Sequence, residues 1–403
     1  MRSDPQPVPL NETSILLEER DRAEQPIYPE SEYLDQEFLE ENKETTIAVL
    51  GAGHGGQAMA GHLARKGFTV NLFNRTHEHI LPIVRLGGIE LKGAVRGFAR
   101  LNKVTSDIKE AIAGAALIMV VVPAVGHKYM AEQCAPHLQK GQVILLNPGR
   151  TFGALEFYNI LKNHGKHRDA IVCEAETFIY AARLTAAAQA KILGIKSAVP
   201  IAALPATRTY EALPVINRAF PQFIPAESTL ETSLNNMACI FHPPITLLNA
   251  ARIENTQGDF QYYIEGVSPA VGAILEAIDQ ERMNLLRILE VKQVSAFEWL
   301  KTSYSPMGRN LVEAIQNNPA YRGIYSPRHV FHRYLTEDVP MSMVPMASLA
   351  QMYDIATTSL SAVIRLCSVI TKRDFIKEGR TAHSLGIDGL TVKNLRRLLM
   401  EGS

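Results

Sequence analysis

The chain has 403 residues, 46% of them hydrophobic and 20% charged, which is typical of a globular protein with about two domains. Its 41 basic residues balance 41 acidic residues, so the net charge does not favour nucleic acid or an anionic membrane as a partner. The four cysteines are far apart and form no CxxC pair. This favours reduced, buried thiols in a cytoplasmic protein over a disulfide framework.

Residues 1–44 are rich in proline, glutamate and aspartate and contain no basic segment followed by a long apolar run. We therefore predict a polar N-terminal leader, ordered in part around Tyr28 and Tyr33, rather than a signal peptide or an anchor. No uncharged apolar run elsewhere reaches the length of a transmembrane helix, so we expect no membrane segment.

The next part of the chain alternates short β-branched runs with helical patterns. The predicted strands are residues 46–51, 69–75, 117–123, 142–147 and 170–176. Because near-continuous apolar strands with helices between them need cover on both faces, they predict a parallel sheet of the Rossmann type, an α/β doubly wound fold. The sheet could continue through residues 190–206.

The second half of the chain shows helical spacing of its apolar residues. The segments with this spacing are residues 232–254, 267–291, 296–304 and 346–370. We therefore expect a dinucleotide-binding Rossmann domain over residues 45–215 and a mainly α-helical second domain over residues 216–403.

Gly51, Gly53 and Gly56 form a G-x-G-x-x-G pattern between a predicted strand and a predicted helix. The first glycine permits a tight turn, the second lets the backbone approach a diphosphate, and the third lets helix and strand pack closely. The N-terminus of the helix adds N–H donors for the anion. This context favours a dinucleotide site over a glycine-rich turn with a structural role only.

The end of the second predicted strand indicates which dinucleotide binds. A carboxylate usually receives the ribose 2′-hydroxyl of NAD there, but this chain has Asn74 and Arg75. Because an arginine can hold a 2′-phosphate by forked, charge-assisted hydrogen bonds, we favour NADP(H) as the cofactor. NAD stays open, since Arg75 could instead stack on the adenine.

Two later strand ends should lie at the same edge of the sheet, where doubly wound folds bind their ligands. Pro123 follows the first of these strands, and Asn147, Pro148 and Gly149 follow the next. We predict that these four residues line the nicotinamide site.

A proton partner beside a hydride carrier is most often a histidine. His242 lies in an apolar helical segment and precedes two prolines, but the pattern alone favours a core histidine with structural partners. Further along, Arg333 and Asp338 could hold a substrate carboxylate and orient a histidine. Alternatively, Glu337 and Asp338 form a solvated turn before a proline.

Two histidine pairs invite a metal site, namely His77 with His79 and His329 with His332. Neither pair is accompanied by a cysteine or carboxylate set that would complete a typical coordination sphere. We therefore assign no metal.

Several segments of the chain, in order, resemble the octopine/nopaline (opine) dehydrogenase family. They are "GAGHGGQAMAGHLA", "VVVPA", "NPGR", "NNMACIFHPPITLLN", "AIDQER" and "HRYLTEDVP". The resemblance spans roughly residues 45–400, and its most specific elements are the histidine-proline pair and the RYxxEDVP-like string.

This resemblance implies a fold, a reaction and a set of site residues. The family combines a Rossmann domain with a helical domain, and it condenses a 2-oxo acid with the amino group of an amino acid before reducing the product. Matched residue by residue, the family's catalytic histidine is His242, its aspartate partner is Asp338, and its arginine for the oxo-acid carboxylate is Arg333.

Other charged residues are open to two interpretations. "EAETFIYAARL" resembles a family stretch at the domain junction, so Glu174, Tyr180 and Arg183 could contact substrate or cofactor, or serve in packing. Arg282 could be a second carboxylate site, but we favour an internal pair with Asp279 or Glu281.

The partners implied are small molecules, a 2-oxo acid and an amino acid, and a homodimer is compatible with this plan. Two rival functions remain at this stage: an NADP-dependent 2-oxo or 3-hydroxy acid reductase that needs no amine, and a sensor or scaffold that binds NADP(H) without turnover. Acceleration of cofactor oxidation by an amino acid distinguishes the opine reaction from both.

Overall fold

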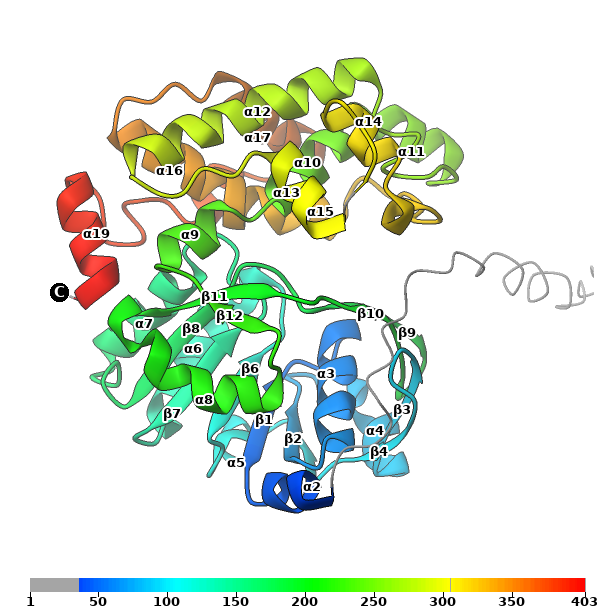
Figure 1. The fold of residues 1–403 in the computed structure, drawn as a ribbon, viewed down its shortest axis with the longest axis vertical. Helices are drawn as coiled ribbons and strands as arrows, with labels where there is room; N and C mark the ends of the chain where they lie inside the picture. Colours follow the sequence, from blue (N-terminus) through cyan, green and yellow to red (C-terminus); the bar gives the residue numbers. More distant parts are fainter. Residues whose placement is uncertain (1–35, 305, 403) are drawn as a thin grey trace, which may run out of the picture.

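The computed structural model describes residues 36–304 and 306–402. Figure 1 shows a sheet with helices on both faces and a second, helical body stacked above it. The predicted leader falls mostly outside the described residues, including Tyr28 and Tyr33. Its last part forms α2 (Gln36–Lys43).

The main sheet has eight strands in the order β12-β11-β8-β7-β6-β1-β2-β5. The strands are β1 (Thr46–Leu50), β2 (Thr69–Phe73), β5 (Lys103–Thr105), β6 (Leu117–Val120), β7 (Gln142–Leu146), β8 (Ala170–Ala175), β11 (Val199–Leu204) and β12 (Phe223–Pro225). The strands from β8 to β5 are parallel, whereas β11 pairs antiparallel with β8. The predicted doubly wound α/β fold is therefore confirmed.

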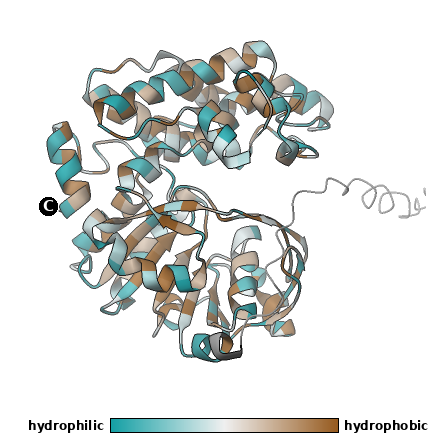
Figure 2. Cartoon of the chain, in the orientation of Figure 1, coloured by the Kyte–Doolittle hydropathy of each residue, from teal (hydrophilic) through white to brown (hydrophobic). Residues whose placement is uncertain are grey.

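Helices cover both faces of this sheet, which explains why its central strands are apolar throughout. They are α3 (His54–Arg65), α4 (Leu81–Leu86), α5 (Ile108–Ile112), α6 (His127–Cys134), α7 (Gly153–Asn163) and α8 (Thr209–Ala219), with 3-10 turns η2 (His77–His79), η3 (Ala124–Gly126), η4 (Ala135–His137) and η5 (Ala206–Arg208). Figure 2 shows the hydrophobic colouring along the strands between these helices.

A second sheet with the strand order β4-β3-β10-β9 packs against α3. Its strands are β3 (Gly88–Gly93), β4 (Gly97–Arg100), β9 (Tyr180–Ala186) and β10 (Gln189–Ile195). The main sheet therefore continues through only part of residues 190–206, because β11 joins it and β10 does not. The main sheet ends with β12, so the cofactor domain extends beyond residue 215, and the predicted boundary at 215/216 falls inside a helix that covers the sheet, residues 209–219.

The remainder of the described chain is helical, as expected. Its elements are α9 (Thr229–Leu234), α10 (Ala238–Leu248), α11 (Ala250–Thr256), α12 (Pro269–Ile288), α13 (Ala296–Tyr304), α14 (Leu311–Gln316), η6 (Pro319–Tyr321), α15 (Arg333–Thr336), the π-helical turn η7 (Val339–Met343), α16 (Val344–Met352), α17 (Thr358–Thr371), α18 (Phe375–Glu378) and α19 (Val392–Glu401). The segment 346–370 contains two helices rather than one, since Asp354 between α16 and α17 has a left-handed backbone with φ 54°.

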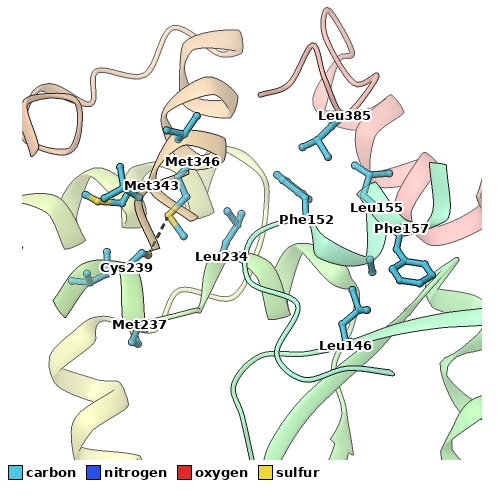
Figure 3. Packing of buried hydrophobic residues seen from close by; sticks show 14 of the residues in the cluster. Leu146, Phe152, Leu155, Phe157, Leu234, Met237, Cys239, Met343, Met346 and Leu385 are labelled. Carbon is cyan, nitrogen blue, oxygen red and sulfur yellow. Dashed lines mark hydrogen bonds between the residues drawn. The ribbon is translucent and has the colours of Figure 1, made fainter. Parts of the chain in front are cut away.

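One apolar cluster crosses the junction of the two domains and fixes their relative orientation. Figure 3 shows members from both sides, including Leu146, Phe152 and Leu155 of the cofactor domain and Leu234, Met237, Met343 and Met346 of the helical domain. The thiol of Cys239 lies 3.8 Å from the sulfur of Met346 within this cluster. The loops at the top of the sheet are therefore held against the helical domain by shared core packing.

All four cysteines are buried and none is in a disulfide. Within the described residues, no helix combines the length and the apolar character that crossing a bilayer requires.

Candidate active site

The glycine-rich turn joins β1 to α3 at the carboxyl edge of the sheet. Gly51 has φ +114°, and a Cβ on Gly56 would lie 1.7 Å from the Gly51 carbonyl oxygen, so both positions require glycine. Gly53 caps α3, and a Cβ there would meet nothing within 4 Å. Because no described side chain caps this helix, its N–H donors and the open space beside Gly53 fit a dinucleotide diphosphate.

Gly53→Ala and Gly56→Ala are expected to fail in different ways. Gly56→Ala overlaps the turn and should lower the free energy of unfolding by about 3 kcal/mol. Gly53→Ala should melt within about 2 °C of wild type yet bind NADPH at least about tenfold more weakly, because its methyl group occupies the space for the diphosphate. Thermal melts and fluorescence titrations with NADPH check both, and unchanged NADPH affinity in Gly53→Ala would contradict this site.

Asn74 and Arg75 follow β2 at the same edge. The Asn74 side chain accepts a hydrogen bond from the Ala52 N–H at 3.2 Å and donates one to the Thr76 carbonyl at 2.9 Å. Arg75 is exposed, and its guanidinium lies 5.4 Å from the centroid of the Tyr129 ring. Asn74 therefore fixes the glycine-rich turn, whereas Arg75 is exposed beside it and can bind a 2′-phosphate or stack on an adenine.

The loops after β6 and β7 carry the other predicted cofactor residues. Pro123 immediately precedes η3, and Asn147 and Pro148 are joined by a cis peptide bond. A Cβ on Gly149 would lie 2.5 Å from the Cβ of Glu174, so this loop packs tightly on β8. Since β6 and β7 are adjacent and parallel, the two loops lie side by side at the carboxyl edge of the sheet.

Glu174 has a packing role in this structure. Its carboxylate accepts hydrogen bonds from the Ala154 N–H at 2.8 Å, the Thr232 hydroxyl at 2.7 Å and the Ser233 hydroxyl at 2.6 Å. Burial raises the pKa of Glu174, although these hydrogen bonds and the charge of Arg380 oppose the rise. The residue thus joins the sheet to α9 and is fully buried.

His242 of α10 and Asp338, the residue before η7, meet side chain to side chain. Nδ1 of His242 lies 2.7 Å from Oδ2 of Asp338. The Asp338 side chain is 1% exposed, whereas that of His242 is 17% exposed. A buried carboxylate at Nδ1 favours the tautomer with its proton there, so Nε2 is the acceptor of the neutral ring.

Tyrosines hold the imidazole in place. The ring of His242 stacks on Tyr334 with centroids 4.0 Å apart, and the Tyr262 hydroxyl donates to the His242 carbonyl at 2.7 Å. Nε2 lies 3.0 Å from the hydroxyl of Tyr263, which donates because burial raises the pKa of this tyrosine well above its usual value. Tyr262 and Tyr263 were not predicted, since "YYIEG" carries no recognisable motif, and Tyr334 lies in the RYxxEDVP-like string but was given no role.

Arg333 lies at the start of α15, one turn before Glu337. Its Nε is 3.2 Å from Oε2 of Glu337, and 56% of the Arg333 side chain is exposed. Glu337 is buried and also accepts a hydrogen bond at 3.2 Å from the N–H of Ala124, in the loop after β6. Glu337 therefore anchors Arg333 to a cofactor loop, and the exposed guanidinium can still bind an anion.

Arg150 ends the NPGR segment, and its buried guanidinium crosses from the cofactor domain to the helical domain. Its Nε lies 3.2 Å from Oε1 of Glu337, and Nη2 lies 3.0 Å from Oδ1 of Asp338. Burial alone would raise the pKa of the Asp338 carboxyl, but the Arg150 charge and the hydrogen bond from His242 lower it. Sequence analysis quoted this segment and assigned no role to its arginine.

Glu176 is a further buried acid at the domain junction, with 8% of its surface exposed. Burial raises the pKa of its carboxyl to about 7, although a hydrogen bond from Trp299 and the charge of Lys196 oppose the rise. Lys196 is itself held by the Thr177 hydroxyl and the Phe178 carbonyl, each at 2.8 Å. Glu176 lies in the segment "EAETFIYAARL", but its sequence offered no reason to single it out from the neighbouring acid.

Glu176→Gln is expected to flatten the pH dependence of stability. The folded-state pKa of about 7 lies above the ordinary value of 4.5, so the folded protein binds more protons between these values than the unfolded chain does. The contribution of Glu176 is therefore full below pH 4.5 and is lost as the pH rises through 7, by up to about 3 kcal/mol. Urea unfolding at about pH 5 and about pH 8 tests this. If the free energy of unfolding changed between the two pH values by the same amount in the variant and in wild type, the prediction would be contradicted.

The remaining predicted residues have structural surroundings. Arg282 pairs with Asp279 at 2.7 Å inside α12 and donates to the Leu234 carbonyl at 3.1 Å, which confirms the internal pair. Tyr180 is buried in the core of the cofactor domain, and Arg183 is exposed on β9. Among the described residues, no group of three histidine, cysteine or acidic side chains could hold a metal ion.

Comparisons with known proteins agree with this arrangement. The sequence model described as NAD/NADP octopine/nopaline dehydrogenase, alpha-helical domain, matches residues 225–371. The model described as NAD binding domain of 6-phosphogluconate dehydrogenase matches residues 46–149. The opine dehydrogenase of Arthrobacter sp. (strain 1C) is 40% identical over 352 residues, covering 87% of this chain and 98% of that relative.

Solved structures support the same fold. Octopine dehydrogenase described with NADH and L-arginine has a TM-score of 0.74 at 21% identity, covering 89% of this chain and 98% of its own. Yersinopine dehydrogenase with NADP+ bound has a TM-score of 0.65 at 15% identity, with 89% and 98% covered. The 40% identity over nearly the whole length of a relative decides the family. The chain belongs to the octopine/nopaline (opine) dehydrogenase family and is an NAD(P)-dependent oxidoreductase that acts on CH–NH bonds.

Proposed function

We propose that this protein condenses a 2-oxo acid with the amino group of an amino acid and reduces the product, with His242 and Asp338 as its catalytic pair. The observation that carries the proposal is the buried Asp338 carboxylate 2.7 Å from Nδ1 of the imidazole, beside loops of the nucleotide-binding edge. The structures named octopine dehydrogenase, with L-arginine and with pyruvate, support these two substrate classes.

In the condensation, His242 moves protons between the two substrates. The neutral imidazole accepts a proton at Nε2 from the amine as its nitrogen bonds to C2 of the oxo acid. The resulting imidazolium gives this proton to the former carbonyl oxygen, which completes the carbinolamine. A second proton then passes from the nitrogen through Nε2 to the carbinolamine hydroxyl, which leaves as water and yields an imine. Asp338 holds the tautomer and stabilises the cationic ring in between.

A dinucleotide held at Gly53 and the loops after β6 and β7 would supply the hydride for the imine carbon, and the imine nitrogen takes up one proton in the reduction. The products are an N-(carboxyalkyl)amino acid, the oxidised cofactor and one water. Arg333 binds the carboxylate of the oxo acid through two parallel hydrogen bonds and so fixes the orientation of C2. Its anchor, Glu337, links this orientation to the loop after β6.

The experiment that tests the proposal follows NADPH absorbance with pyruvate or 2-oxoglutarate, first alone and then with pooled amino acids. We expect oxidation only with both substrates, and its loss in His242→Ala. His383→Ala is the matched control, because His383 also lies beside an aspartate, Asp388 at 3.8 Å, but is 91% exposed. Oxidation indifferent to amine would identify an oxo-acid reductase, and NADPH binding without oxidation would identify a sensor.

Arg75 is expected to determine the preference for NADPH over NADH. Its exposed guanidinium beside Asn74 can bind a 2′-phosphate by charge-assisted hydrogen bonds, so Arg75→Ala should raise KM for NADPH about thirtyfold and KM for NADH less than about threefold. Arg85→Ala, an exposed arginine on α4, serves as the control. Equal changes for both cofactors would assign Arg75 to adenine stacking.

We also propose a cytoplasmic homodimer in which each chain carries the cofactor domain followed by the helical domain, and which binds neither nucleic acid nor membranes. Four buried cysteines outside any disulfide and balanced charge support this setting. Sedimentation equilibrium of the full chain tests the dimer, and a single monomeric species at micromolar concentration would reject it.

A further inference from the structure

We infer that Arg150 is a positioning residue, one that sets the proton affinity of the His242–Asp338 pair from the opposite domain. The inference rests on the proposed function, since it concerns how that pair exchanges its proton. Arg150 lies in the cofactor domain after β7, whereas both members of the pair belong to the helical domain.

The geometry divides the Asp338 carboxylate between two partners. Oδ2 faces Nδ1 of His242 at 2.7 Å, and Oδ1 faces Nη2 of Arg150 at 3.0 Å. The same guanidinium meets Glu337 through Nε at 3.2 Å and the Asn236 side-chain oxygen through Nη1 at 3.5 Å. Arg150 therefore orients Asp338 and offsets part of the negative charge that would otherwise hold a proton on the imidazole.

The backbone around Arg150 delivers this guanidinium rigidly. Arg150 has φ +58°, in the left-handed region that non-glycine residues seldom adopt. The next two residues are tied to the helical domain: the Thr151 N–H donates to the Met341 carbonyl at 3.1 Å, and the Phe152 N–H donates to the Ser233 hydroxyl at 2.9 Å. A loop held in this way places a charge at one point beside the pair.

Burial moves the pKa of several other groups around the pair away from neutral pH. The titratable and charged groups facing it are Arg150, Cys239, Tyr262, Tyr263, His332, Arg333, Tyr334 and Glu337. Burial raises the pKa of the three tyrosines and raises that of Cys239 to about 12. Burial, together with the Arg333 charge, lowers the pKa of His332 to about 4.

The charge that each substitution removes decides the direction in which the pH dependence of kcat should move. Oxidation of the opine product needs the neutral imidazole as base, so kcat rises with pH along an acid limb. Arg150→Met removes the offsetting charge and should move the midpoint of this limb up by about one pH unit or more. Glu337→Gln removes a negative charge that Arg150 otherwise also pairs with. The Arg150 charge then acts on Asp338 alone, so the midpoint of the limb should move down. Arg150→Lys keeps the charge and should stay within about 0.3 unit of wild type.

The experiment measures kcat against pH for oxidation of the N-(1-carboxyethyl)amino acid made from pyruvate and the amino acid that drives NADPH oxidation. All variants carry Glu176→Gln, because the pKa of Glu176 near 7 could add a limb of its own. Opposite shifts in Arg150→Met and Glu337→Gln support the inference. Unmoved midpoints, or shifts in one direction for both, overturn it even if kcat falls.

A second measurement keeps the inference separate from the proposed function. Carbon-13 labelled histidine gives a ring signal for His242, identified by its loss in His242→Gln, and its titration midpoint is read in the NADP-bound protein without turnover. The same opposite shifts are expected there, including in any variant too inactive to assay. Absence of opine oxidation in wild type would refute the proposed function, whereas absence of these shifts would refute the role of Arg150.

Discussion

Asp338→Asn is expected to lower kcat/KM for amine-dependent NADPH oxidation about a thousandfold without unfolding the protein. The asparagine amide can donate to Nδ1, which forces the imidazole proton onto Nε2 and removes the acceptor that the amine needs. Nearly the same shape remains in the buried position, so NADPH binding should change little. Steady-state kinetics, a thermal melt and an NADPH titration measure these three quantities.

The matched control is Asp388→Asn, which removes an aspartate that also lies beside a histidine but is 64% exposed. It should retain wild-type kinetics. An Asp338→Asn enzyme with more than about a tenth of wild-type kcat/KM would show that the carboxylate does not fix the catalytic tautomer.

Arg333→Leu is expected to raise KM for the oxo acid about a hundredfold while KM for NADPH stays within about twofold. The exposed guanidinium can make a bidentate, charge-assisted contact with the substrate carboxylate, which leucine cannot replace. Arg333→Lys should lie between wild type and Arg333→Leu, because it keeps the charge and loses the fork. Initial rates measured at varied concentrations of the oxo acid, with NADPH and the amine saturating, give the KM of wild type and of both variants.

Arg309→Leu provides the control for this substitution. Arg309 also pairs with a glutamate four residues later, Glu313 at 2.8 Å. The Arg309 side chain, just before α14, is 90% exposed. Its loss should leave every KM unchanged. If Arg333→Leu kept its KM for the oxo acid, the carboxylate would have to bind to another cation.

The parallel sheet was predictable from the chain because the central strands are apolar along nearly their whole length. Residues 117–120 and 142–146 are fully buried between helices, and a strand buried on both faces shows no alternation of polar residues. The glycine spacing was equally informative, since a Cβ at Gly51 or Gly56 would overlap backbone atoms. Patterns set by local geometry can be read from the sequence.

The small sheet could not be separated from the main one by its sequence. Strand β10 and strand β11 follow each other closely, and both are rich in β-branched or apolar residues. Their assignment to different sheets depends on long-range pairing, with β10 beside β3 and β11 beside β8. Pro243 and Pro244 lie inside α10 for a similar reason, because tertiary packing outweighs the local preference against proline.

The members of the active site also depend on contacts between distant residues. The resemblance to a known family named His242, Asp338 and Arg333, whose side chains the fold brings near one another. The resemblance gave no role to Arg150 or Tyr263, and their contacts with Asp338 and His242 became visible only in the folded structure. A buried arginine with left-handed backbone has no signature in the sequence.

In the proposed reaction, one active site forms the carbon–nitrogen bond and then reduces the imine. The most direct test supplies NADPH with deuterium at both C4 positions of the nicotinamide, a nitrogen-15 labelled amino acid and pyruvate, and analyses the product by mass spectrometry and NMR. We expect one product with deuterium on the former C2 of pyruvate and nitrogen-15 bonded to that carbon. Deuterium recovered only in a 2-hydroxy acid without nitrogen-15 would contradict it.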